Sequence, residues 1–395
     1  MDSRQVLVVF IPKRYTSLAR NPLTQSITFR NKTMTNDELL SKTISWLRFP
    51  LIVGVVFIHN NISTITIQGR EFVFDNPDWY YAVINFFSEV LPRIAVPLFF
   101  FISGFLFFYN VEAFDAQTYK RKLKSRVKTL LIPYLIWNFA GFLLFSIKHI
   151  PALSHVFPNV YVYPYNLKAF LDSFWTISID PNGALLYPIN FPFWFIRDLM
   201  IVVLFTPLLY WLVRHLRFVP VLLLGICWFF GLWFHVAGLS STTWFFFTFG
   251  AYLSINRLNP VSILGKFQWL PIVYIVVALL DTATKGASYN GYIHKMGILL
   301  GVASCFILTA RGIGSGRLAV NKFLSDGSFF VFASHGLIIG LIMKGLFVVI
   351  CPQSPYVLIL FYFLVPIVTI LLCLFVYRLL KRYLPRVAAV VTGGR

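Results

Sequence analysis

Long apolar runs separated by short polar segments set the pattern of this sequence. Ten of these runs predict α-helices, and most approach the ~20 residues that a helix needs to cross a bilayer. The pattern predicts an all-α integral membrane protein, with about ten transmembrane helices around a central cavity. We place the helices at roughly residues 43–61, 82–109, 129–148, 192–213, 218–237, 241–256, 267–284, 292–310, 327–350 and 356–378.

The composition supports a membrane protein. Charged residues make up 12% of the 395 residues and hydrophobic residues 58%, whereas soluble domains carry about 25% charge. The four cysteines all lie in or beside apolar runs and show no metal-ligand spacing. We therefore expect buried, unreactive thiols and no metal site.

The basic residues are distributed unevenly between alternate loops. Lys and Arg number 34 against 14 Asp and Glu, and they concentrate before the first helix, in residues 110–128 and after the last helix. This asymmetry predicts that both chain termini lie in the cytoplasm. It also explains the net charge of +20 as membrane orientation and attraction to anionic lipid. We therefore expect the lipid bilayer, and no nucleic acid, as a partner.

The chain divides into three predicted segments. These are a basic N-terminal tail over residues 1–42, a ten-helix membrane domain over 43–380 and a short cytoplasmic tail over 381–395. Residues 1–33 differ in composition from the rest of the chain. This difference suggests either a disordered tail or a native start at Met34.

The stretch "RFPLIVGVVFIHN", residues 48–60, keeps an arginine and a histidine in the apolar first helix. Ser41 or Thr43 is the expected N-cap of this helix. Eleven residues advance an α-helix by about three turns plus 20°, so Arg48 and His59 share one face about 16 Å apart. One interpretation is that Arg48 reaches the cytoplasmic interface and His59 the outer one. The functional interpretation is that both line a hydrated cavity, because charge inside a membrane is costly.

The second predicted helix carries an arginine between two prolines. Arg93 follows Pro92 and precedes Pro97, and each proline frees a backbone carbonyl and can kink the helix. Kinked helices with a nearby cation often line cavities. Arg93 is therefore either an anchor at the outer interface or a cavity residue.

Two later helices also carry ionisable groups. "FWFIRDLM" holds Arg197 and Asp198, which need not pair because adjacent helical residues diverge by about 100°. "SDGSFFVFASHG" opens the ninth helix, with Ser325 or Asp326 as the expected cap. It places His335 about 13 Å along the helix, close to the membrane midplane. His335 is either a buried neutral histidine bonded to a neighbour or a functional residue.

The loop "KRKLKSRVKTLLIPYLIWN" enters the third helix with a dense run of basic residues. One interpretation is a solvated loop that only sets the membrane orientation. The alternative is a docking face for an anionic cytosolic substrate, such as a nucleotide diphosphate. Arg121, Lys122 and Arg126 are the candidate contacts in that case.

The longest predicted outer segment covers residues 149–191. Within it, "NLKAFLDSFWTI" predicts a short amphipathic helix lying at the membrane surface. The aromatic clusters "YVYPY" and "FPFW" either stack on sugar rings or anchor the segment at the interface.

Five of these motifs together resemble a known family. "SWLRFPLIVGVVFIHN", "RIAVPLFFFISGFLFF", "KSRVKTLLIPYLIWN", "FWFIRDL" and "FFVFASHG" are similar, in the same order, to motifs of membrane acyltransferase family 3. The resemblance covers about residues 42–380. It implies a stand-alone O-acetyltransferase-like member, without an extracytoplasmic esterase-like domain, in a bacterial inner membrane. Such members move acyl groups, most often acetyl from acetyl-CoA, onto envelope glycans or lipid-linked sugars.

The resemblance also implies roles for the candidate residues. A histidine can deprotonate the acceptor hydroxyl as general base because its pKa lies near operating pH, and His59 matches the family's histidine. Arg48, ten residues before it in the family's spacing, is implied to hold a phosphate or the thioester end of the donor. Acyl-CoA is then a donor substrate, and no bound cofactor is expected. Residues implied in donor or acceptor binding are Arg93, His335, Arg197, Arg121, Lys122 and Arg126.

A second function class remains open at this point. A transporter or flippase for a glycan or lipid-linked sugar also has many spans with buried Arg and His. Such carriers often show inverted repeats with paired broken helices, and we find no convincing repeat in this sequence. Both a direct transfer and an acyl-enzyme are compatible with the enzyme reading, and the sequence defines no oligomeric state.

Overall fold

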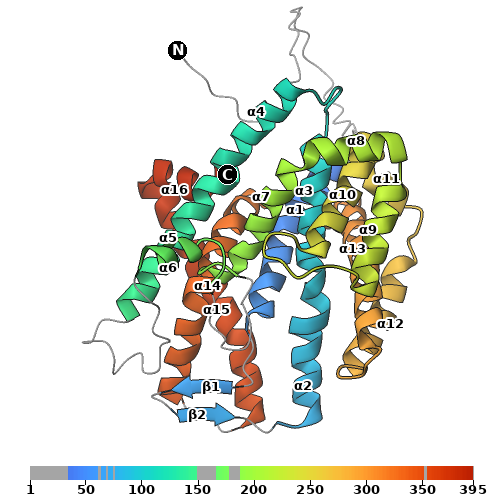
Figure 1. The fold of residues 1–395 in the computed structure, drawn as a ribbon. Coiled ribbons are helices and arrows are strands. Elements are labelled where there is room, and N and C mark those ends of the chain that lie inside the picture. The colour runs from blue at the N-terminus through green and yellow to red at the C-terminus, as the bar shows by residue number, and fades with distance from the viewer. Residues whose placement is uncertain are drawn as a thin grey trace, which may run out of the picture. The chain divides into compact units, whose positions relative to one another are not determined.

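Apolar helices packed side by side form most of the chain in a computed structural model (Figure 1). The structure describes residues 34–60, 64–67, 70–73, 76–148, 166–177, 187–350 and 354–394. Residues Thr35–Arg395 form one compact unit. The predicted tail therefore lies largely outside the described residues, as does Cys351.

The first helix, α1 (Asn36–Ile58), begins earlier than predicted. Thr35 and Glu38 form a capping box, in which each side chain accepts a bond from the other residue's backbone N–H at 3.2 Å. This box satisfies two free N–H groups at once. The prediction that Ser41 or Thr43 caps the helix was therefore wrong.

The second predicted helix runs continuously from Asp78 to Phe108 but changes its winding near the two prolines. Pro92 and Pro97 have no N–H, so neither donates to a carbonyl one turn earlier. The expected kink is thus a local change of winding around Arg93. The successive segments are α2 (Asp78–Ile84), the π-helix η1 (Asn85–Val90), the 3₁₀-helix η2 (Leu91–Ile94) and α3 (Ala95–Phe108).

The remaining helices follow the predicted order. α14 (Lys322–Ile350) is capped by Asn321, whose side-chain oxygen accepts from the Leu324 N–H at 3.2 Å. The prediction of Ser325 or Asp326 as its cap was therefore wrong. The other segments are α4 (Ala116–Arg126), the π-helical η3 (Val127–Leu131), α5 (Ile132–Lys148), α6 (Leu167–Asp172), the 3₁₀-helix η5 (Phe191–Phe193), α7 (Trp194–Leu204), α8 (Thr206–Leu216), α9 (Val219–Phe230), α10 (Ser241–Ile255), α11 (Pro260–Leu264), α12 (Leu270–Ala283), α13 (Asn290–Gly314), α15 (Pro355–Tyr383) and α16 (Pro385–Val391).

The number of full spans is smaller than predicted. Six of the described helices are long and apolar enough to cross a membrane, or seven if α7 and α8, bent by 62°, form one span. The helices α9, α10 and α12 have 12, 15 and 14 residues. At about 1.5 Å per residue they are shorter than a ~30 Å hydrocarbon core. All ten predicted segments are helical, but ten complete spans are not confirmed.

A two-stranded hairpin is an exception to the all-α prediction. β1 (Thr64–Ile67) and β2 (Arg70–Val73) pair in antiparallel fashion, with Thr64 opposite Val73 and Ile67 opposite Arg70. The β-branched run "TITI" favours an extended strand. Figure 1 shows the hairpin at the opposite end of the unit from α4 and α8.

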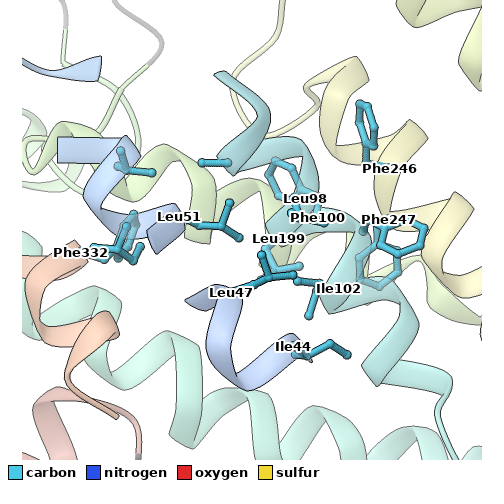
Figure 2. Close-up of a cluster of buried hydrophobic side chains, with 14 of the residues drawn as sticks. Ile44, Leu47, Leu51, Leu98, Phe100, Ile102, Leu199, Phe246, Phe247 and Phe332 are labelled. Carbon is cyan, nitrogen blue, oxygen red and sulfur yellow. The ribbon is translucent and has the colours of Figure 1, made fainter. Parts of the chain in front are cut away.

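The core lies where α1 and α3 meet α7, α10 and α14. Figure 2 shows Leu47 and Leu51 of α1 beside side chains from these helices. α3 and α10 cross at two glycines: an added Cβ would lie 2.0 Å from a backbone oxygen both at Gly104 and at Gly250. Only a hydrogen fits at each position, so the two backbones can touch, as small residues allow between membrane helices.

The membrane orientation can be tested at two exposed serines, Ser125 on α4 and Ser288 in the turn between α12 and α13. Figure 1 shows these two parts at opposite ends of the unit. In a variant without native cysteines, an impermeant maleimide should label Ser288→Cys on intact cells but Ser125→Cys only after lysis. The reason is that the basic α4 end is predicted to face the cytoplasm. The reverse labelling pattern would invert the topology.

Candidate active site

A cavity of about 940 Å³ lies between the helices and collects polar side chains from distant parts of the sequence. Its wall is formed by α1, η2, α3, α5, α7, α13, α14 and the segment between α9 and α10. Apolar and aromatic side chains make up most of the lining, as is usual for small-molecule sites. The ionisable residues of the lining are His59, Arg93, Arg197, Asp198, His235 and His294.

His59 occupies the point where α1 ends. Its backbone, with φ −94° and ψ 9°, leaves the helical conformation, and its side chain lines the cavity. The imidazole packs edge-on against Phe191, with ring centroids 4.6 Å apart. It makes no hydrogen bond to a described residue. A ring nitrogen is therefore available to a substrate in the cavity.

His335 of α14 lies against His59, with the two imidazoles stacked at 5.6 Å. It is fully buried, and its Nδ1 lies 2.7 Å from the Phe332 carbonyl oxygen. Because a carbonyl only accepts, Nδ1 carries the proton and donates to it. Nε2 is buried without a partner among the described residues. Of the two alternatives for His335, a buried imidazole bonded to a neighbouring carbonyl agrees with the structure. Its role as a site residue stays a prediction, and its place beside His59 could not be read from the sequence.

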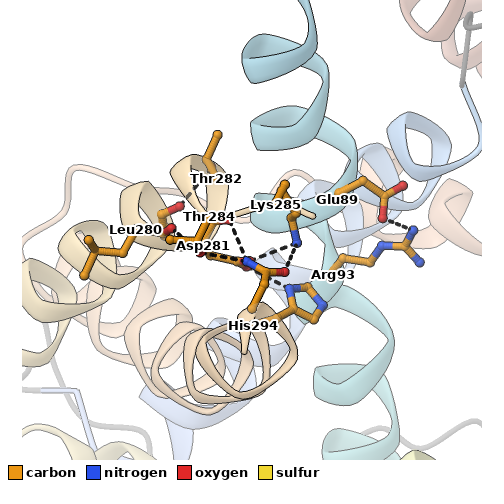
Figure 3. Close-up of polar contacts among 10 residues, drawn as sticks. Glu89, Arg93, Leu280, Asp281, Thr282, Thr284, Lys285 and His294 are labelled. Atoms are coloured by element: carbon orange, nitrogen blue, oxygen red, sulfur yellow. Dashed lines mark hydrogen bonds and ion pairs between the residues drawn. The ribbon is translucent and has the colours of Figure 1, made fainter. Parts of the chain in front are cut away.

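Arg93 and Arg197 both line the cavity but differ in how far they are committed to the protein. Arg93 pairs with Glu89 one turn earlier (Figure 3), and its side chain is 37% exposed. Arg197 has a side chain only 3% exposed. An arginine carries five N–H donors, so Arg93 keeps donors free for a substrate.

Arg197 pairs with its neighbour Asp198, although the helix does not require this. Its Nε and Nη2 donate to Asp198 Oδ1 at 3.1 and 2.9 Å, and its Nη1 donates to the Trp175 carbonyl at 2.6 Å. Asp198 Oδ2 also accepts from the Ser240 N–H at 3.3 Å. The pair thus ties α7 to two other segments of the cavity wall.

Five of the predicted site residues lie outside the cavity lining: His335, which is described above, Arg48 and three residues of α4. Arg48 is half-buried on α1, on the face that carries Val55 two turns later, and Val55 does line the cavity. The negative charge of Asp326 on α14 attracts the Arg48 guanidinium. The other three residues belong to α4: Arg121 is exposed, and Lys122 and Arg126 lie over the Phe107 ring at 5.2 and 5.7 Å.

The structure adds a histidine that sequence reasoning missed. His294 on α13 lines the cavity, and its Nδ1 lies 2.7 Å from Oδ2 of Asp281 on α12. An ionisable residue inside an apolar helix is a functional candidate by default. "ALLDTATK" and "YIHKMGILL" carried that signal for both residues.

Comparison with known proteins gives a direct result. The acyltransferase domain of the family Acyl_transf_3 matches residues 42–378. The chain belongs to this family. A relative, the succinoglycan biosynthesis protein ExoH of Rhizobium meliloti (strain 1021), is 28% identical over 383 residues, or 91% of this chain and 94% of ExoH. No solved structure matches the chain significantly.

The acyltransferase match covers all the residues that line the cavity. It begins before His59 on α1 and ends within α15, after His335 on α14. The apolar helices and the family together make this chain a multi-pass membrane acyltransferase.

Proposed function

We propose that this acyltransferase moves an acyl group from cytosolic acyl-CoA to a hydroxyl of a cell-envelope polysaccharide or lipid-linked sugar. Acetyl is the acyl group that we propose. The observation that carries the proposal is His59, which ends α1 in a cavity of about 940 Å³ and whose imidazole has no hydrogen-bond partner among the described residues. The relative ExoH, named for succinoglycan biosynthesis, supports a polysaccharide acceptor.

In the proposed chemical step, His59 is the general base. His59 takes the proton of the acceptor hydroxyl while the hydroxyl oxygen attacks the thioester carbonyl carbon. The carbon–sulfur bond then breaks, and the proton passes from His59 to the departing CoA thiolate. General base help of this kind contributes about 10²–10⁴-fold in rate.

Arg93 is proposed to stabilise the negative charge that develops on the thioester oxygen. Its side chain lines the cavity and is 37% exposed, so it can reach a bound substrate. N–H donors that are already held in place are most effective where charge forms away from bulk water. Arg197 is proposed to hold the cavity wall instead, because its guanidinium is already bonded to Asp198 and Trp175. His335 is proposed to hold the His59 ring in place by stacking on it at 5.6 Å.

The transfer itself is tested with purified protein in nanodiscs. The assay supplies radiolabelled acetyl-CoA or succinyl-CoA and unacylated envelope glycan from a deletion strain. We expect label in the glycan together with release of free CoA. In proteoliposomes, glycan uptake without CoA release would instead identify a carrier and reject the enzyme.

The basic residues of α4 give a separate prediction about the donor. Neutralising Arg121, Lys122 and Arg126 together should raise the KM for acetyl-CoA on the order of tenfold, because ion pairs of up to about 1 kcal/mol each with the donor phosphates are lost. The effect should shrink in high salt, which screens exposed charges. Lys168→Ala on α6 is the control, since this exposed lysine lies at the predicted outer side. An unchanged KM in the triple variant would leave these residues with a role in orientation only.

A further inference from the structure

A polar cluster outside the predicted site is built around one buried carboxylate. Asp281 lies in the last turn of α12, and its side chain is only 1% exposed. It lies 2.9 Å from the Lys285 ammonium and 2.9 Å from the Asn290 amide nitrogen, and His294 donates to its other oxygen at 2.7 Å. Figure 3 shows Lys285 and His294 converging on the Asp281 carboxylate.

The cluster holds His294 in a defined tautomer. We take His294 as a neutral imidazole, because Lys285 already pairs with the Asp281 carboxylate at 2.9 Å. A carboxylate only accepts, so Nδ1 of His294 carries the proton, as in the carboxylate–histidine pairs that orient a ring for use at its other nitrogen. Nε2 is then an acceptor, and the described residues offer it no partner. His294 lines the cavity with its side chain 24% exposed.

The surroundings of His294 fit a sugar. Trp228, Trp233 and Phe234, from α9 and the segment after it, line the same cavity. Aromatic rings offer a flat apolar surface to the C–H face of a sugar ring, and an oriented acceptor at the edge binds a hydroxyl. Lys295, the residue after His294, donates to the Phe229 carbonyl at 2.8 Å and fixes α13 beside this aromatic wall.

We propose that His294 is an acceptor-binding residue of the cavity: its Nε2 accepts a hydrogen bond from a sugar hydroxyl, and Asp281 is the residue that positions it. This inference rests on the proposed function, since it names how the same cavity holds its carbohydrate. It separates two histidine roles. His59 acts on the hydroxyl that reacts, and His294 holds a hydroxyl that does not.

The test compares wild-type protein with His294→Ala, His294→Gln and the control His215→Ala in nanodiscs. The first measurement is binding of unacylated deletion-strain glycan without any donor. We expect His294→Ala to weaken binding about three- to tenfold, the usual effect of losing one hydrogen bond. His294→Gln should recover part of the loss, because its amide oxygen can accept near the position of Nε2. His215→Ala on α8, where the imidazole is bonded to the Trp211 carbonyl at 2.8 Å outside the cavity lining, should bind as wild type.

The second measurement is steady-state transfer from acetyl-CoA. For His294→Ala we expect a raised glycan KM, an unchanged acetyl-CoA KM and a kcat within about twofold of wild type, because the interaction is made equally before and during reaction. Wild-type binding and glycan KM in both His294 variants would overturn the inference, as would a kcat loss as large as that of His59→Ala. If the wild-type protein binds glycan through His294 but transfers no acyl group, the proposed function fails and the binding site stands.

Discussion

Replacing His59 with alanine should lower acyl transfer by about 10²–10⁴-fold, the usual contribution of a general base. The imidazole ends α1 in the cavity, and the described residues leave its nitrogens unbonded. Removing it takes away the proton acceptor without removing an internal hydrogen bond, so the fold should persist. The measurement is turnover of labelled acetyl-CoA at matched membrane abundance, together with acetyl-CoA binding, which should be retained.

His215→Ala is the matched control for this variant. His215 lies on α8, bonded to the Trp211 carbonyl at 2.8 Å, and it does not line the cavity. Its replacement should leave turnover unchanged. The wild-type rate should also fall at acid pH, because a protonated imidazole accepts no proton. Near wild-type turnover in His59→Ala would reject the mechanism and make this histidine a structural end of the helix.

Arg48 should show a different loss in the same assay. Its place on the His59 face of α1, beyond the lining residues, suits contact with the donor and not the acceptor. Arg48→Ala should weaken acetyl-CoA binding, and Arg48→Lys should restore little of it, because lysine lacks the planar fork that grips phosphate.

Replacing Arg197 with methionine should destabilise the protein by about 3–5 kcal/mol, the cost of leaving a buried charge without its partner. Both side chains of the Arg197–Asp198 pair are nearly inaccessible. The variant would also lose the bond to the Trp175 carbonyl, which connects α7 to the segment after α6. The measurement is the temperature at which detergent-solubilised protein disappears from its size-exclusion peak.

Two controls identify the buried charge as the cause. The double variant Arg197→Met and Asp198→Asn should recover much of the lost stability, since it no longer buries an unpaired carboxylate. Lys168→Met breaks the Lys168–Asp172 pair, in which the lysine is 85% exposed, and exposed pairs contribute little. Melting of Arg197→Met at the wild-type temperature would show that the pair does not stabilise the fold.

The existence and order of the helices were predictable from the sequence, but their ends and lengths were predicted less accurately. Apolar runs indicate helices because a buried backbone must bond to itself, and all ten predicted segments are helical. The caps were misplaced because α1 and α14 begin before their apolar runs, at Asn36 and Lys322, so the predicted cap residues lie inside the helices. Thr35 was preferred to Ser41 through its reciprocal bond with Glu38. The 62° bend between α7 and α8 depends on packing that no local pattern records.

The sequence by itself determined the class of protein, the acyltransferase motifs and the placement of Arg48 and His59 on one helix face. These features depend on composition and on a period of 3.6 residues. Only the tertiary structure decided which ionisable residues meet. It stacked His335 on His59, joined Arg197 to Asp198, and brought His294 to Asp281 and to the cavity. The His335–His59 contact joins helices far apart in the chain, His294–Asp281 joins consecutive helices, and Arg197–Asp198 joins neighbours whose side chains would diverge on an ideal helix. All three depend on side-chain packing. A single-helix pattern carries no information about its neighbour's face.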